Sequence, residues 1–194
     1  MKLNSLREAE AQRPVDGYFA RATLPLRISD ELAEAAFVAP LSDTLDRLGI
    51  GRVVGYELAL DEQGEPVRLH IQLSLVTDAP RVLQAVADAL DKLDAPAGSY
   101  IGNAECVDLV SFGHSQGLGL YLPRADTREE DRTAVVEACR DALGQAGLYQ
   151  GSVSVGDRTA LYFYGDSFNR MKSAITYVIT TDPRCRNAFA RRLN

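Results

Sequence analysis

The chain is poor in the residues that mark covalent or metal-centred architectures. It has three cysteines, Cys106, Cys139 and Cys185, an odd number without a Cys-x-x-Cys spacing, which argues against a disulfide framework and a structural zinc site. Its two histidines, His70 and His114, have neither helical nor hairpin spacing, and no group of carboxylates follows an EF-hand pattern. The sequence therefore predicts no metal site and no cofactor.

Long apolar runs are also missing. No run approaches the roughly 20 residues that a membrane-spanning helix needs. The segment Met1–Pro14 is polar and lacks the apolar centre of a signal peptide. We therefore expect a cytoplasmic protein that has no contact with a membrane.

Positive charge is scarce and concentrated at one end. The formal net charge is −6, and residues 183–194 contain four arginines and no acidic residue, so removing these four charges leaves −10 for the rest of the chain. An acidic body disfavours binding to nucleic-acid phosphates and favours basic partners. Nucleic-acid binding, with the arginine-rich end as its contact surface, is therefore a hypothesis that the net charge opposes.

One glycine-bounded phrase recurs three times, at Gly51–Gly55, Gly98–Gly102 and Gly147–Gly151, with starting points 47 and 49 residues apart. Each copy follows an amphipathic helical stretch and opens an extended apolar one, so a supersecondary unit is repeated. A phosphate-binding loop would precede a helix rather than follow it. The glycines are therefore interpreted as helix C-caps and bends in strands.

Hydrophobic periodicity outlines the elements. Extended apolar patterns predict strands at residues 22–28, 53–60, 67–75, 118–122, 149–155 and 159–164, with further extended structure within 100–112. Amphipathic patterns predict helices over residues 30–48, 78–93, 126–146 and 166–178, the first of them broken or kinked at Pro40. Residues 184–193 fit either a strand or a short helix.

These elements form four strand–helix–strand units joined by hairpins. Two such units make one βαββαβ, ferredoxin-like domain. We therefore expect an α+β fold of two tandem ferredoxin-like halves, with antiparallel sheets and helices packed on one face of each. The expected boundaries are an N-terminal extension at 1–17, a first half at 18–114 and a second half at 115–194.

Catalytic chemistry has little support in the sequence. A triad of Cys106, Asp108 and His114 can be drawn, but the thiol and the imidazole lie near opposite ends of one extended segment. At about 3.3 Å per residue they are too far apart for proton transfer unless the strand folds back. We therefore expect a protein that is not an enzyme.

Three groups of residues are candidates for binding a partner protein. One is an acidic hairpin loop, and the second is an acidic helix start whose carboxylates also stabilise the helix itself. The third is a pair of tyrosines that share one face of a strand and would anchor an interface if that face is exposed. The candidates are Asp61, Glu62 and Glu65; Asp126, Glu129, Glu130 and Asp131; and Tyr162 and Tyr164.

The segment 149–164 carries a Tyr-x-Gly strand, a turn, Arg158 and a Tyr-Phe-Tyr strand that leads into a helix at 166–174. This pattern resembles the ribonuclease E inhibitor family (the regulator of ribonuclease activity B) and related domains, over about the last third of the chain. The tryptophan often found in the wider group is absent here. The resemblance implies a ferredoxin-like fold and inhibition of another protein through an acidic surface, with no catalytic residues.

The leading hypothesis is therefore a non-enzymatic inhibitor of a nuclease or toxin, of the kind that compact acidic immunity proteins and antitoxins represent. The alternative is a ligand-binding or enzymatic protein of the dimeric ferredoxin-like barrel type. In that case the two halves would enclose a pocket between their sheets, lined by His70, Tyr100 and His114. A cavity between facing sheets would favour the alternative.

Overall fold

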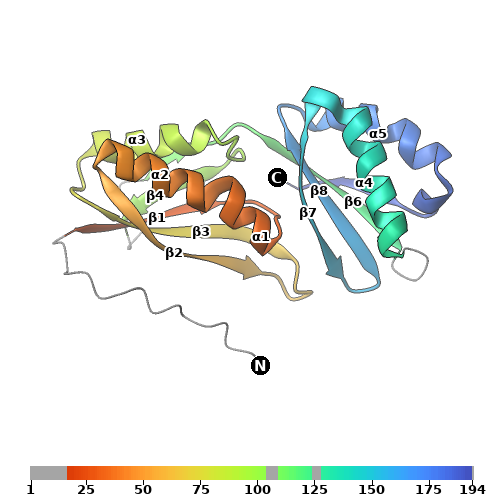
Figure 1. The fold of residues 1–194 in the computed structure, drawn as a ribbon, viewed down its shortest axis with the longest axis horizontal. Helices are drawn as coiled ribbons and strands as arrows, with labels where there is room; N and C mark the ends of the chain where they lie inside the picture. The colour runs from red at the N-terminus through yellow and green to blue at the C-terminus, as the bar shows by residue number, and fades with distance from the viewer. Residues whose placement is uncertain (1–16, 104–108, 124–127, 194) are drawn as a thin grey trace.

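The computed structural model describes residues 17–103, 109–123 and 128–193, which form two sheets, each carrying its own helices (Figure 1). The strand order is β2-β3-β1-β4-β5 in the first sheet and β7-β8-β6-β9 in the second, and paired strands run antiparallel. The strands are β1 (Tyr18–Leu24), β2 (Gly51–Leu60), β3 (Pro66–Leu75), β4 (Ser99–Asn103), β5 (Val110–Phe112), β6 (Gln116–Pro123), β7 (Leu148–Val155), β8 (Arg158–Gly165) and β9 (Phe189–Arg192).

Helices connect the strands in the order βαββαβ within each half. The helical segments are α1 (Asp30–Ala33), η1 (Glu34–Val38), α2 (Ala39–Leu48), α3 (Pro80–Asp91), α4 (Glu129–Leu143), η2 (Gly144–Ala146), α5 (Phe168–Thr181) and η3 (Pro183–Cys185). Together with the strand order, this makes two tandem ferredoxin-like halves, the first with β5 added at its edge. Within the described ranges, no helix is both long and apolar enough to span a bilayer.

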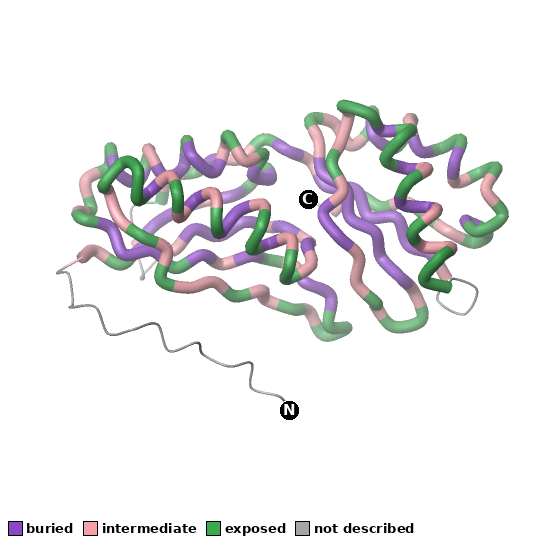
Figure 2. The backbone as a smooth tube through the Cα atoms, in the orientation of Figure 1, coloured by how far each residue is buried: buried purple, intermediate pink, exposed green. Residues whose placement is uncertain are grey.

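Each half has a hydrophobic core between its sheet and its helices (Figure 2). Alternation along the strands sends every second side chain into that core, and each large aliphatic side chain buried there contributes about 1.5–3 kcal/mol. Leu48, at the end of α2, is largely exposed, whereas Leu41 and Leu45 of the same helix are buried. The second core contains Leu118, Leu120, Leu122, Val135, Cys139, Leu143, Leu161, Phe163, Met171 and Ile175.

The sequence predicted a break or a kink at Pro40, and the structure shows that the helix is not broken there. The segments α1, η1 and α2 follow one another without interruption, and η1 is a π-helical turn in which the Ala39 N–H donates to the Glu34 carbonyl. A proline normally clashes with the carbonyl one α-turn before it. The wider π-turn gives the ring room, so the helix continues through Pro40.

The C-terminal segment is a strand, which resolves the choice that the sequence left open. Residues Pro183–Cys185 form a short 3-10 turn, and β9 then pairs with β6 along residues Leu118–Tyr121. The second sheet thereby gains the fourth strand that a ferredoxin-like half needs.

The two halves pack against each other through the open face of the second sheet, the face that carries no helices. Tyr121, Tyr162 and Tyr164 point away from the second core and belong to the core of the first half. Beside them, the Ser29 N–H donates to the Gln150 carbonyl at 3.3 Å. The open face of the second sheet is therefore largely an internal interface.

Gly151 marks the closest approach of β7 to the first half. Its φ is +109°, and a Cβ there would lie 2.7 Å from Ser29 Oγ and 3.1 Å from Ser29 N. We expect Gly151→Ala to lower the free energy of unfolding by about 1–3 kcal/mol, because it forces Ser29 away. Urea unfolding measures the change. Gly156→Ala is the matched control, since Gly156 also has a positive φ but faces open space; equal losses in both variants would contradict the close contact.

Candidate functional site

Glu65 is the centre of the contact between the halves. It ends the β2–β3 loop, where Asp61 Oδ1 accepts hydrogen bonds from the N–H groups of Gln63 and Glu65 at 3.0 and 2.9 Å. These bonds close the loop tightly and turn the Glu65 side chain inward, where the residue is only 3% exposed. A carboxylate that is buried this far requires charged and hydrogen-bonding partners.

The second half supplies most of those partners. The hydroxyls of Tyr121 and Tyr162 donate to Glu65 Oε1 at 2.7 and 3.0 Å. Glu65 Oε2 lies 2.7 Å from Arg27 Nη1 and 3.5 Å from Arg191 Nη2. Arg27 Nη1 is buried and makes no hydrogen bond, so this ion pair is what compensates its charge. We call these residues, with Tyr164, the Glu65 cluster.

Tyrosine hydroxyls complete the Glu65 cluster as neutral donors and acceptors. Burial is the main cause that raises the pKa of Tyr121 to about 12, and the hydrogen bond to Glu65 raises it further. Burial also raises the pKa values of Tyr162 and Tyr164. The Tyr164 hydroxyl accepts a hydrogen bond from the Arg27 backbone N–H at 2.9 Å. All three phenols therefore stay protonated at neutral pH and bind the first half.

The position of these residues corrects part of the predicted partner surface. Tyr162 and Tyr164 do share one face of β8, as predicted, but both are buried. Glu65 was expected on an exposed acidic loop and is buried instead, because the short loop directs it between the halves. These three residues join one half of the chain to the other and are not available to an external protein in this arrangement.

Strand β9 closes the outer edge of the Glu65 cluster with a stack of rings and guanidinium groups. Phe189 stacks on Tyr121 with ring centroids 5.0 Å apart and planes 9° apart. The guanidinium carbons of Arg158 and Arg191 lie 4.9 and 4.8 Å from the centroids of Phe189 and Tyr121. Arg191 Nη2 also donates to the Tyr121 hydroxyl at 2.6 Å. Part of the arginine-rich C-terminal segment therefore holds the second sheet to the cluster.

Sequence reasoning missed Arg27, Tyr121 and Arg191 as members of this cluster. The one available signal was the alternation in β6, which places Tyr121 on the face opposite Leu118, Leu120 and Leu122. That signal shows the side of the sheet but not the partner, because Glu65 is 56 residues away in the chain.

Side chains of the Glu65 cluster are packed in the contact between the halves. Two surface grooves follow the seam on either side of Leu148, of about 330 and 250 Å³. None of the three residues predicted to line an inter-half pocket borders either groove. His70 and Tyr100 lie on the open face of the first sheet, and His114 lies beside Asp91 and Asp94 at 3.7 and 3.5 Å.

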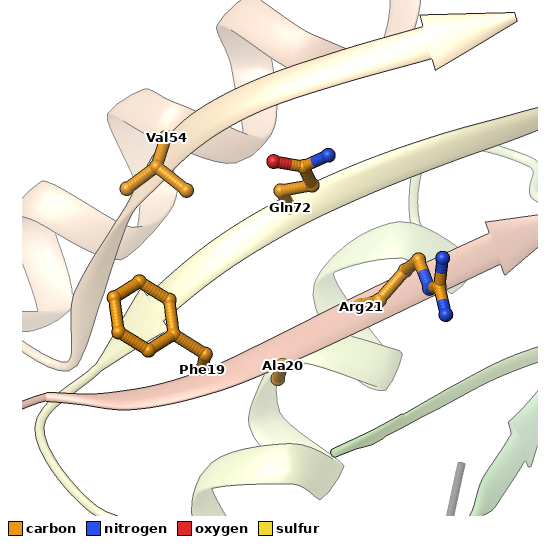
Figure 3. Close-up of a pocket in the computed structure, with 5 residues that line it drawn as sticks. All are labelled: Phe19, Ala20, Arg21, Val54 and Gln72. Carbon is orange, nitrogen blue, oxygen red and sulfur yellow. The ribbon is translucent and has the colours of Figure 1, made fainter. Parts of the chain in front are cut away.

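The open face of the first sheet carries a groove of about 360 Å³ (Figure 3). Phe19 and Val54 lie side by side at one end, and Gln72 and Arg21 lie further along it. Val54 sits at a β-bulge between Val53 and Gly55, where β2 shifts register against β3. Phe19 is 62% exposed and Val54 45% exposed, so this face presents apolar surface to solvent next to hydrogen-bonding groups.

His70 lies in the next row of this open face. Its Nδ1 is 3.0 Å from Thr23 Oγ1, within hydrogen-bond distance. Burial is the largest cause that lowers the pKa of His70; Arg21 and Arg68 lower it further, and Glu57 opposes the shift. His70 is therefore neutral at pH 7, and its observed role is a hydrogen bond between neighbouring strands.

Charge is sorted by layer in the described part of the chain. The strands carry one acidic residue, Glu57, and six basic ones: Arg21, Arg52, Arg68, Arg158, Arg191 and Arg192. Helices α1 to α4 with their π-turn carry four arginines, Arg47, Arg81, Arg132 and Arg140, and twelve acids: Asp30, Glu31, Glu34, Asp43, Asp46, Asp88, Asp91, Glu129, Glu130, Asp131, Glu137 and Asp141. Twelve of the chain's 27 acidic residues therefore lie on α1 to α4, whereas α5 carries Arg170 and Lys172 and no acidic residue.

The remaining acidic candidates lie at two places. Glu62 is exposed at the tip of the β2–β3 hairpin, and Asp61 is used by the loop itself. Glu129 and Glu130 are exposed in the first turn of α4, where Glu129 pairs with Arg132. Asp131 is half-buried and lies 3.5 Å from Arg128, and Asp126 falls outside the described residues.

The two cysteines that the structure describes are not nucleophilic. Cys139 and Cys185 are buried in the second half, and burial raises the pKa of Cys139 to about 12 and that of Cys185 to about 11. Both thiols are therefore protonated and inert at neutral pH. Cys106 and Asp108 lie outside the described residues, so the structure does not place the triad that includes them. Elsewhere, the described residues contain no group of three metal-ligating side chains.

No protein-family model matches the chain, and no curated protein matches it. Several solved structures are similar at low identity. A protein of unknown function from Galdieria sulphuraria is 14% identical, with 91% of this chain and 96% of that chain covered and a TM-score of 0.29. The regulatory subunit of aspartate kinase from Thermus thermophilus is 15% identical over 86% and 94%, with a TM-score of 0.29.

A proposed monooxygenase from Fusobacterium nucleatum is 9% identical, with 91% of each chain covered and a TM-score of 0.30. Likenesses at this level carry no inference about function. The resemblance of residues 149–164 to the ribonuclease E inhibitor family therefore stays a prediction.

The ion pair at the centre of the Glu65 cluster can be tested with a double-mutant cycle. Glu65→Leu alone leaves Arg27 buried without a partner, so we expect a loss of about 3–5 kcal/mol in the free energy of unfolding. Adding Arg27→Met should recover part of that loss, because the buried charge is then removed and the half-exposed Arg191 stays solvated. Urea unfolding of the four proteins gives the coupling energy. Strictly additive losses would show that the two charges do not interact.

A second prediction concerns pH. Because the pKa of His70 is lower in the folded protein than the ordinary value of 6.5, the unfolded chain binds the extra proton first as pH falls. Stability should therefore rise with pH over the range that ends near the ordinary pKa of 6.5, where the unfolded chain is protonated and folded His70 is not, and His70→Gln should flatten that rise. The free energy of unfolding measured by urea at each pH tests this. A slope unchanged in His70→Gln would refute the prediction.

Proposed function

We propose that this chain is a non-enzymatic, cytoplasmic protein-binding inhibitor that neutralises a basic partner through the acidic helices. The observation that carries the proposal is the sorting of charge, with twelve acidic against four basic residues on α1 to α4. Opposite charge speeds association and selects partners more than it sets final affinity. A set of helices with this acidic excess is therefore suited to capturing a basic protein quickly.

A nuclease or a nuclease toxin fits the partner that these helices would recognise. Such an enzyme must present a basic surface to the phosphates of its substrate. An acidic protein face is complementary to the same surface and would block it. The resemblance of the last third of the chain to the ribonuclease E inhibitor family supports the same class of partner.

The exposed start of α4 is the part of this layer that we assign first to the partner. Glu129 and Glu130 project from the first helical turn, with Asp131 beside them. Each carboxylate there also stabilises the helix by about 0.3–1 kcal/mol. Neutralising them therefore affects both the partner and the helix, and the two effects must be separated.

The test is quantitative capture of the partner from the native cell with the tagged chain, identified by mass spectrometry and then measured with the purified partner. We expect one stoichiometric basic protein whose affinity falls with salt. The triple variant Glu129→Gln, Glu130→Gln, Asp131→Asn should bind on the order of tenfold more weakly at low salt. Circular dichroism confirms that α4 is retained.

Glu57→Gln is the matched control, because Glu57 is the acidic residue on the strands and lies on the opposite side of the first sheet. It should leave the affinity unchanged. Capture of no partner at low salt, or equal binding by the triple variant and the natural chain, would overturn the proposal.

A further inference from the structure

We propose that the open face of the first sheet binds single-stranded nucleic acid. This goes beyond the proposed inhibitor function, because it concerns the opposite side of the first half and a different class of ligand. It also departs from the expectation based on net charge. Twelve of the 27 acidic residues lie on helices α1 to α4, whereas among the described residues this face carries Arg21, Arg52 and Arg68 with one carboxylate, Glu57.

Strand pairing arranges the side chains of this face in successive rows. The first row contains Phe19, Ser74 and Arg52, and the second Arg21 and Gln72 with Gly55. The third contains Tyr100, Thr23, His70 and Glu57, and Arg68 follows in the fourth. Each row thus presents at least one planar group, namely a phenyl, guanidinium, amide, imidazole or phenol group.

Planar groups on an open sheet are what unstacked bases require. Bases of a single strand stack on aromatic rings and guanidinium planes, and hydrogen-bond through their edges. Phe19, more than half exposed, offers a ring at one end of the groove, and Val54 forms the wall beside it (Figure 3). Gln72 carries an amide that can bond a base edge further along the same groove.

The length of the face suits a short strand. Rows lie two residues apart along β3, which is about 6.6 Å, so four rows extend over roughly 20 Å. That is room for about four nucleotides, at the lower end of the site sizes of single-strand binding domains. Exposed Arg52 and Arg68 lie toward opposite ends of this length, where each can neutralise a phosphate.

An acidic polypeptide would satisfy the arginines equally well. It would not use the succession of planar groups between them, since carboxylate side chains do not stack. The observations therefore favour nucleic acid, and an acidic peptide becomes one of the outcomes of the test.

A substitution at Gly55 is the most specific test of the groove. A Cβ at this position would meet only Gln72 Oε1, at 3.7 Å, and the backbone of Gly55 is not in a positive-φ conformation. Gly55→Leu therefore fills the groove without removing a charged or planar group and without straining the strand. Phe19→Ala removes the exposed ring, and Arg52→Gln with Arg68→Gln removes two charges.

The measurement is fluorescence anisotropy of a labelled twelve-nucleotide oligouridylate and an oligodeoxythymidylate of equal length, at 50 and 300 mM salt. We expect binding that weakens with salt and that falls at least tenfold in Phe19→Ala and in Gly55→Leu. The double arginine variant should also lose affinity and show a smaller salt dependence. Arg47→Gln on the exposed end of α2 and Phe189→Ala on β9 are controls that should bind as the natural chain does.

Three results would overturn the proposal. These are absence of binding at 50 mM salt, binding by Gly55→Leu and Phe19→Ala that equals that of the natural chain, and tighter binding of a polyglutamate peptide or a twelve-base-pair duplex than of the single strand. Gly55→Leu should still capture the basic partner, so loss of this site and loss of the proposed inhibitor function are distinguishable.

Discussion

The arrangement of this molecule depends on one buried carboxylate. Glu65 could not be buried alone, because the desolvation of a charge far exceeds what apolar packing returns. It is compensated by Arg27 from its own half and by Tyr121, Tyr162 and Arg191 from the other. Separating the halves would therefore expose an apolar tyrosine face and also break the network, which ties the two sheets into a fixed relation.

The packing of the two halves around Glu65 decides which surfaces remain exposed for function. A ferredoxin-like half has one sheet face under its helices and one face without them. The second half uses much of its open face on Tyr121, Tyr162 and Tyr164 against the first, whereas the first sheet keeps Phe19 and Val54 exposed. Two halves with the same strand order thus differ in function. The open face of the second sheet packs against the first half, whereas the open face of the first sheet is exposed to solvent at Phe19 and Val54.

The local patterns in the sequence were sufficient for the fold. The alternation at Leu69, Ile71, Leu73 and Leu75 predicts β3, whose four residues are buried on one face, and the hairpin at 61–66 is where it was expected. The sequence could not show that the helix continues through Pro40, because a π-turn, which relieves the clash, depends on how the helix packs and leaves no periodic trace.

The site was much less predictable. The contacts of Glu65 with Tyr121 and Tyr162 join residues 56 and 97 positions apart. A carboxylate in a polar hairpin has the same local signature whether it is exposed or buried, so its neighbours in the chain could not reveal its partners. Tyr162 and Tyr164 could be assigned to one face of a strand, but the packing of the halves decides what covers that face.

Net charge does not describe how charge is distributed over the surfaces of this chain. A value of −6 describes an average over surfaces that do not act together. Screening at physiological salt limits each exposed charge to about 8 Å, so a ligand on the first sheet experiences Arg52 and Arg68 more strongly than the carboxylates beyond the sheet on α2 and α3. One acidic chain can therefore present a basic face on its strands and an acidic face on its helices, and a recognition hypothesis must be judged on the layer that the ligand meets.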